Sequence, residues 1–246
     1  MVKKISAIIL ALALCLSVAV IPTTAAGFDS DYQFAEGIGT AFKLELDKQY
    51  YNPGDIVTVS VYARFADESR EVKGGTLMFG VNSAQFDVTD SFNKEISTAT
   101  ANATWESYWK SPASTQFAWQ SNQNIINRVL GACTTDAGVY DKLLKVSLAQ
   151  DANKALDMTH GLPAADLNAD PDPLLTFQLK LRNDLPEGTQ IKIGIPTGAV
   201  FAVPAQVTLQ FFLNPGVAST ARADAASTYD ITDTVPQASI GTPAPA

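Results

Sequence analysis

The sequence contains few of the residues that build reactive or cross-linked sites. Its 246 residues include two cysteines and one histidine, which excludes a disulfide-rich scaffold and a histidine-based metal centre. Basic residues are also scarce, because 17 Lys and Arg stand against 25 Asp and Glu for a net charge of −8. Nucleic-acid-binding surfaces are basic, so we expect no nucleic-acid partner. Neither a nucleophile elbow nor a phosphate-binding loop occurs, so we expect a non-catalytic protein without a cofactor.

One long hydrophobic run is present, and it covers residues 5–21. Two lysines precede it, and a proline and several small residues follow it. This pattern is typical of a secretory signal peptide and predicts cleavage after Ala26, whereas a membrane anchor of similar length is the alternative. We therefore interpret 1–26 as a signal peptide and expect a secreted, extracellular chain with no membrane insertion after processing. The mature chain would keep one cysteine, Cys133, and carry a net charge of −10.

Apolar and polar residues alternate along much of the mature chain, and turns rich in Pro and Gly separate the alternating stretches. Period-two alternation predicts strands that bury one face, and no spacing typical of β-α-β units occurs. We therefore expect an all-β fold with two packed sheets, a β-sandwich over residues 27–215. The strands are predicted at 42–46, 57–63, 74–81, 144–148, 175–182, 191–195 and 207–213.

Two regions depart from this rhythm. Residues 91–142 carry all three tryptophans, and we interpret them as a long, partly helical insertion at one edge or end of the sandwich. Ser121 is predicted to cap a short helix in this segment. Residues 216–246 are rich in Ala, Ser and Thr, with a weak strand near 228–235 and an ending typical of an interdomain linker.

Three stretches resemble the cohesin family, the scaffold modules of bacterial cellulosomes, and the related carbohydrate-binding modules. They are 51–61 with its turn Pro53-Gly54-Asp55, 74–88 (GGTLMFGVNSAQFDV), and 175–189 with its turn Pro186-Glu187-Gly188. The resemblance implies a nine-stranded jelly-roll sandwich in which 74–88 belongs to an exposed, partner-facing sheet. The family's usual Tyr-Asp-Pro after the third strand is replaced here by Asn82-Ser83-Ala84-Gln85.

The acidic stretch around residue 170 is a candidate calcium loop. Oxygen ligands at alternate positions suit a hard cation, but a proline stands where a calcium loop needs glycine. A solvated turn before a strand is the favoured interpretation. The weaker, metal-binding interpretation names Asp166, Asn168, Asp170 and Asp172.

The aromatic residues of the insertion are the stronger candidates for a binding site. Flat rings stack on sugar rings while amides and hydroxyls bind the sugar hydroxyls, although burial in the core is the ordinary fate of tryptophan. The candidate carbohydrate-binding residues are Trp105, Tyr108, Trp109, Trp119, Gln120, Asn122 and Gln123.

The sequence thus leads to three hypotheses. The first is a secreted, non-catalytic module that binds a polysaccharide such as starch, cellulose or xylan and holds a degradative assembly on it. The second is a true cohesin, a scaffold module that binds the dockerin of a partner enzyme through a flat sheet face. The third is a surface adhesin or structural domain. Attachment to the cell surface through further modules is compatible with each.

Overall fold

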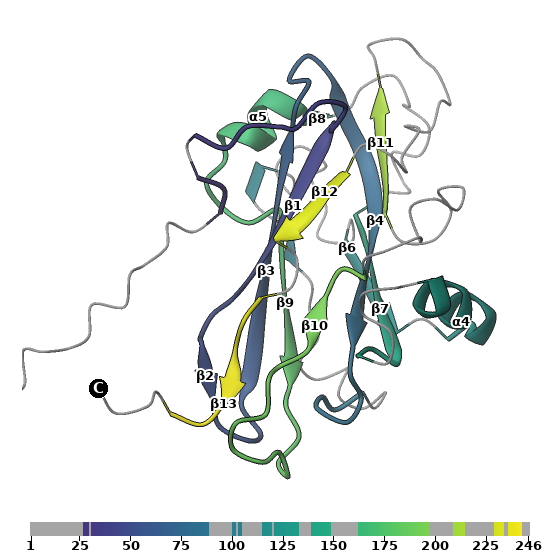
Figure 1. Ribbon diagram of the computed structural model, residues 1–246. Helices are drawn as coiled ribbons and strands as arrows, with labels where there is room; N and C mark the ends of the chain where they lie inside the picture. Colours follow the sequence, from purple (N-terminus) through teal and green to yellow (C-terminus); the bar gives the residue numbers. More distant parts are fainter. Residues whose placement is uncertain are drawn as a thin grey trace, which may run out of the picture.

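The computed structural model describes residues 27–29, 31–88, 100–101, 103–104, 115–119, 121–132, 139–148, 162–196, 209–214, 229–233 and 236–242. Strands dominate these residues, as the alternation predicts (Figure 1). The strands are β1 (Thr40–Leu46), β2 (Tyr50–Tyr51), β3 (Ile56–Phe65), β4 (Glu71–Val81), β5 (Thr100–Ala101), β6 (Thr115–Trp119), β7 (Lys142–Leu148), β8 (Leu162–Pro163), β9 (Leu175–Lys180), β10 (Ile193–Gly194), β11 (Leu209–Asn214), β12 (Tyr229–Asp233) and β13 (Ser239–Ile240); the helices are α4 (Gln123–Ala132) and α5 (Ala164–Ala169).

The first sheet has the strand order β12-β1-β3-β9-β5. Strand β3 lies at its centre and pairs antiparallel with β1 on one side and β9 on the other. The edge strand β12 runs parallel to β1, with Thr40 opposite Tyr229 and Lys43 opposite Asp233. A second parallel pair, β2 with β13, brings a C-terminal strand alongside the segment that connects β1 to β3.

The second sheet follows the order β10-β4-β7-β6. Its long strand β4 pairs antiparallel with β7 along residues 75–81, and also pairs with β8, β10 and β11. Figure 1 shows the two sheets face to face, with β1, β3 and β9 in one layer and β4, β6 and β7 in the other. The predicted two-sheet β-sandwich is confirmed.

The core lies between the sheets and is built from the apolar residues of the alternating pattern. In β9 the burial pattern follows the sequence strictly, because Leu175, Phe177 and Leu179 are fully buried and their neighbours are partly exposed. The rings of Phe79 on β4 and Phe177 on β9 lie 4.9 Å apart between centroids, so they join the two layers directly. Each buried aromatic side chain removes about 150–250 Å² from water, which makes such pairs a main source of stability.

Polar contacts around the Tyr51 hydroxyl hold the corner between β1 and β2. The Tyr51 hydroxyl donates to Asp47 Oδ1 at 2.8 Å and accepts the Lys48 N–H at 3.1 Å. Asp47 Oδ1 also accepts the N–H of Thr58 at 2.7 Å, which links this corner to β3. Burial raises the pKa of Tyr51 well above its usual range, and the hydrogen bond to Asp47 raises it further.

The segment 91–142 differs from the insertion predicted for it. Of its described parts, β5 is the edge strand of the first sheet and β6 is the edge strand of the second. Helix α4 follows β6, close to the helix predicted after Ser121. Strand β6 was not predicted from the sequence. Its alternating stretch is only five residues long and ends in a tryptophan, which suggested an aromatic cluster instead of a strand. At least these parts of the segment therefore belong to the sandwich itself.

Candidate functional site

The aromatic candidates are only partly visible in the structure. Trp105, Tyr108, Trp109 and Gln120 lie outside the described residues. Trp119 is described: it pairs with Leu144 across β6 and β7, is half-buried, and packs against the core. Its ring therefore belongs to the inner face of the second sheet rather than to a platform in solvent. Its indole N–H is buried without a hydrogen-bond partner among the described residues.

The two polar companions of these aromatics lie at the start of helix α4. Asn122 Oδ1 accepts the N–H of Asn124 at 3.0 Å, so Asn122 takes the capping role that was predicted for Ser121. The Gln123 side-chain amide donates to Asn127 Oδ1 at 2.7 Å, one turn along the helix. Both residues are exposed, and both of these contacts stabilise the helix.

The candidate calcium stretch folds differently from a metal loop. Asp166 and Asn168 lie on helix α5, and the backbone turns only after it. Asn168 Oδ1 accepts the N–H of Phe65 at 2.9 Å, and its Nδ2 donates to the Phe65 carbonyl at 2.8 Å. The same Nδ2 donates to Glu68 at 2.9 Å, and Asp170 accepts the N–H of Asp172 at 2.9 Å.

Through these contacts the Asn168 amide joins α5 to the end of β3, and we call them the Asn168 clasp. A calcium ligand needs a carbonyl oxygen free to face the ion, and this oxygen already faces the Phe65 amide. Among the described residues no group of three or more His, Cys, Asp or Glu side chains is placed to hold a metal ion. Sequence reasoning missed the clasp because its two ends are far apart along the chain.

The outer face of β4 and β7, on the side of the second sheet away from the core, is the candidate docking surface. Alternation places Met78, Gly80, Leu143 and Lys145 on this face, and Ala118 of β6 lies beside Lys145. Met78 and Leu143 are buried although they do not belong to the core between the sheets. Lys145 is half-buried and Ala118 is exposed, so the face opens to solvent towards β6.

Tyr140 covers part of this outer face. An added Cβ on Gly80 would lie 2.5 Å from two ring atoms of Tyr140, so the ring packs directly on the glycine backbone. Tyr140 itself is 5% exposed. Glycine at this position thus permits a close approach that any side chain would block.

Polar contacts also hold the segment that follows β4 in the same sheet. Both the N–H and the hydroxyl of Ser83 donate to the carboxylate of Asp141, joining the segment after β4 to the one before β7. Gln85 is buried, donates to the Gln190 carbonyl at 2.7 Å and accepts the N–H of Lys192 at 2.8 Å. The stretch Asn82–Gln85, where the sequence departs from the cohesin pattern, therefore ties β4 to β7 and to the residues before β10.

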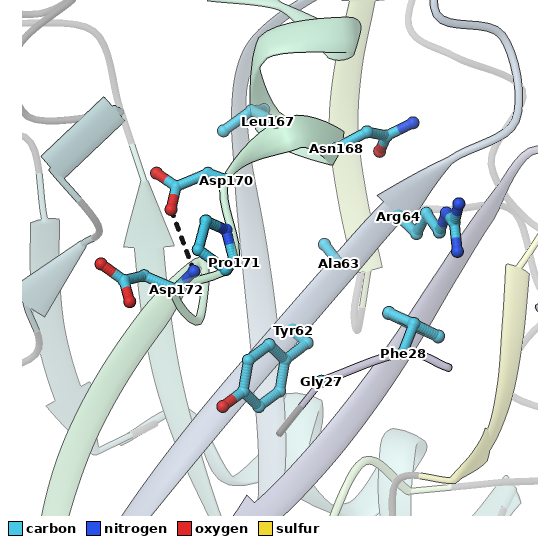
Figure 2. A pocket seen from close by; sticks show the side chains of 10 residues that line it. All are labelled: Gly27, Phe28, Tyr62, Ala63, Arg64, Leu167, Asn168, Asp170, Pro171 and Asp172. Atoms are coloured by element: carbon cyan, nitrogen blue, oxygen red, sulfur yellow. Dashed lines mark hydrogen bonds between the residues drawn. The ribbon is translucent and has the colours of Figure 1, made fainter. Parts of the chain in front are cut away.

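An open hollow of about 250 Å³ lies on the other side of the sandwich, where α5 meets the outer face of β3 (Figure 2). Tyr62 forms part of its wall, and Figure 2 shows Gly27 and Phe28 on one side of that ring and Asp172 on the other. Burial raises the pKa of Tyr62, and the negative charges of Glu45 and Asp172 raise it further.

The part of the chain that the structure describes holds no helix with the length and hydrophobicity needed to span a bilayer. No family model and no curated protein matches the chain.

Solved structures with a similar fold are cohesin domains. The sixth cohesin of Acetivibrio cellulolyticus scaffoldin B, solved with a Cel5 dockerin, is 12% identical over 81% of this chain and 97% of its own, with a TM-score of 0.43. The type II cohesin A11 of Bacteroides cellulosolvens is 10% identical over 82% and 99%, with a TM-score of 0.45. The cohesin module of a Clostridium perfringens family 33 glycoside hydrolase is 8% identical over 82% and 97%, with a TM-score of 0.44.

Proposed function

We propose that the chain is a secreted, non-catalytic protein-binding module that binds a dockerin-bearing partner through the outer face of β4 and β7. One observation carries the proposal: the three stretches that resemble cohesins in sequence occupy coherent places in one sandwich. The stretch 51–61 forms the turn into β3, 74–88 forms most of β4 and the turn after it, and 175–189 forms β9 and its turn. The last two occupy neighbouring layers of the same core.

The choice of face follows from 74–88, the stretch in which the resemblance implies a partner-facing sheet. In the structure this stretch contributes Met78 and Gly80 to the outer face of the second sheet. The end of this face towards β6 is open, and a charged residue at an open sheet face suits a protein partner because it orients the partner. Lys145 provides that charge at the open end of the face, next to Ala118.

The polysaccharide-binding hypothesis has less support. Trp119, the tryptophan among the described residues, packs against the core, and Asn122 and Gln123 bond within α4. The remaining aromatic candidates lie outside the described residues. The test below therefore measures polysaccharide binding as the alternative to dockerin binding.

The test measures binding of the chain 27–246 to a panel of dockerin domains by pull-down and calorimetry. For a dockerin that binds, Lys145→Glu should weaken the affinity by roughly 10-fold, because it reverses a charge at the interface. Lys180→Glu is the matched control, since Lys180 is a partly exposed strand residue on the outer face of the first sheet.

Four results decide between the hypotheses. A selective loss in Lys145→Glu supports the proposal, whereas a loss in Lys180→Glu alone places the partner on the opposite sheet. If no dockerin binds and the chain is retarded in gels containing starch, cellulose or xylan, polysaccharide binding replaces the proposal. If the chain binds neither dockerin nor polysaccharide, the adhesin or structural hypothesis stands.

A further inference from the structure

A short N-terminal segment is bound to the outer face of the first sheet by contacts at Gly27, which we call the Gly27 clasp. The Gly27 N–H donates to Glu45 Oε1 at 3.2 Å, and the Gly27 carbonyl accepts a hydrogen bond from Lys43 Nζ. Lys43 and Glu45 are paired with each other at 2.9 Å, so β1 binds both polar groups of this one residue. Further along, Arg64 of β3 donates to the Asp29 carbonyl at 3.3 Å.

Glycine is strongly favoured at the first position of this clasp. Gly27 is buried and has a φ of +85°, a left-handed conformation that other residues adopt rarely. An added Cβ would lie 3.1 and 3.3 Å from two ring atoms of Tyr62. The site therefore favours glycine at the residue that directly follows the predicted signal-peptidase bond.

The charged side chains around Gly27 carry a net negative charge. The side chains that clasp Gly27 or line the adjacent hollow include the carboxylates of Glu45, Asp170 and Asp172 and the cations of Lys43 and Arg64. A neutral amide at Gly27 leaves this group with an excess of negative charge. An ammonium at the same nitrogen would balance it and would strengthen the contact to Glu45, because charge-assisted hydrogen bonds are stronger than neutral ones.

We propose that this clasp is a binding site for the chain's own new N-terminus, which forms when a signal peptidase hydrolyses the bond between Ala26 and Gly27. Water adds its hydroxyl to the Ala26 carbonyl carbon and its proton to the Gly27 nitrogen. The new α-amine is protonated at neutral pH and pairs with Glu45 as the sandwich folds. Processing thus stabilises the exported fold, and an uncut chain lacks this ion pair.

The first test determines the N-terminus of the exported protein by mass spectrometry. We expect the exported protein to begin at Gly27. The second compares the melting temperature of the chain 27–246 with that of 26–246, both released from a fusion by a protease that leaves no extra residue. The longer chain keeps an amide at Gly27. We expect it to melt about 2–6 °C lower, the shift that follows from losing one charge-assisted hydrogen bond in a chain of this size.

A Glu45→Gln background separates this ion pair from other effects of chain length. Without the carboxylate, chains 27–246 and 26–246 should melt within about 1 °C of each other, because the ammonium has lost its partner. Glu36→Gln is the control, since Glu36 is exposed on the same N-terminal segment, and it should keep the full difference. An exported chain that begins at another residue, or an equal difference in the Glu45→Gln background, would overturn the proposal.

Discussion

The outer faces of the two sheets differ in kind although the sheets share one core. On the first sheet, β3 presents Thr58 and Ser60 between apolar neighbours, and Gln178 of β9 donates to the Thr58 hydroxyl at 3.3 Å. On the second, the corresponding face carries Met78 and Leu143, which are 5% and 1% exposed. Around Thr58 and Ser60 the outer face of the first sheet is therefore polar and partly exposed, whereas around Met78 and Leu143 the outer face of the second sheet is apolar and covered.

This difference is visible in the sequence, although the long strands of both sheets were predicted. A strand with one wet face shows clean alternation, whereas a strand covered on both faces becomes a nearly continuous apolar run. The run from Leu77 to Val81 has no polar residue at all. The candidate docking surface lies at the open end of this face, where Lys145 is half-buried and Ala118 is exposed.

The largest expected effect concerns the inner face, where the two sheets should behave alike. Phe79→Ala and Phe177→Ala should each lower the free energy of unfolding by about 3–5 kcal/mol, because each leaves a cavity between the layers. Urea unfolding followed by circular dichroism measures both. Ile56→Ala is the control, since Ile56 is 40% exposed on the outer face of the first sheet, and it should change the free energy by less than about 0.5 kcal/mol. Unequal losses for the two phenylalanines would show that the sheets do not share the core equally.

The second prediction tests the covered outer face. Gly80→Ala should lower the free energy of unfolding by about 1–3 kcal/mol, because the new methyl group overlaps the Tyr140 ring. In a Tyr140→Ala background the same substitution should cost less, and the double-mutant cycle in urea unfolding reports the coupling. Ser60→Ala on the outer face of the first sheet is the matched control, with an expected change below about 0.5 kcal/mol. Equal costs of Gly80→Ala with and without Tyr140 would contradict the packing.

The third prediction concerns the polar contacts that stabilise the first sheet. Asn168→Ala should lower the free energy of unfolding by about 1–3 kcal/mol, because it removes both hydrogen bonds between the Asn168 amide and the Phe65 backbone. Thermal unfolding detects this loss. Asp166→Ala on the exposed side of the same helix is the control, and a loss as large as that of Asn168→Ala would show that the helix, not the clasp, is responsible.

The smallest effect is a pH dependence at the outer face of the first sheet. Because burial raises the pKa of Tyr62 in the folded state, the unfolded chain releases this proton first, near pH 10. The contribution of Tyr62 is therefore fully present below pH 10 and is lost as the pH rises through the folded pKa. Tyr62→Phe should make the alkaline fall in the free energy of unfolding shallower. Denaturant titrations from pH 8 to 11 measure it, with Tyr50→Phe as the control, since Tyr50 is 40% exposed.

Local patterns were enough to predict most strands and the sandwich. The turn Pro53-Gly54-Asp55 precedes β3 as expected, and the weak strand near 228–235 is β12. Prediction was poorer where contacts join distant residues. The Asn168 clasp to Phe65 spans 103 positions, and the Gln85 bridge to Gln190 spans 105, so no short window of sequence contains either. Strand β6 was missed because Trp119, which packs on the core, resembled an exposed aromatic.

The candidate site was predicted less well than the fold for a related physical reason. Sequence composition reports that an aromatic residue is present but not which face of a strand it occupies, and a shift of one residue reverses that face. Trp119 illustrates this directly, because its strand partner is the core residue Leu144. For Asp166 and Asn168, alternate spacing suited a metal loop, but helix α5 turns successive residues in different directions.

The parallel pairs β1–β12 and β2–β13 have a mechanical consequence. Thr40 lies opposite Tyr229 and Lys43 opposite Asp233, so the start of β1 and the end of β12 are at opposite ends of their shared ladder. Tension applied through the two ends of the chain would pull these strands past each other along their length. The hydrogen bonds of these pairs would then be loaded in shear along the strands. Both parallel pairs thus join strands from the two ends of the sandwich sequence in the geometry that shear, rather than peeling, would separate.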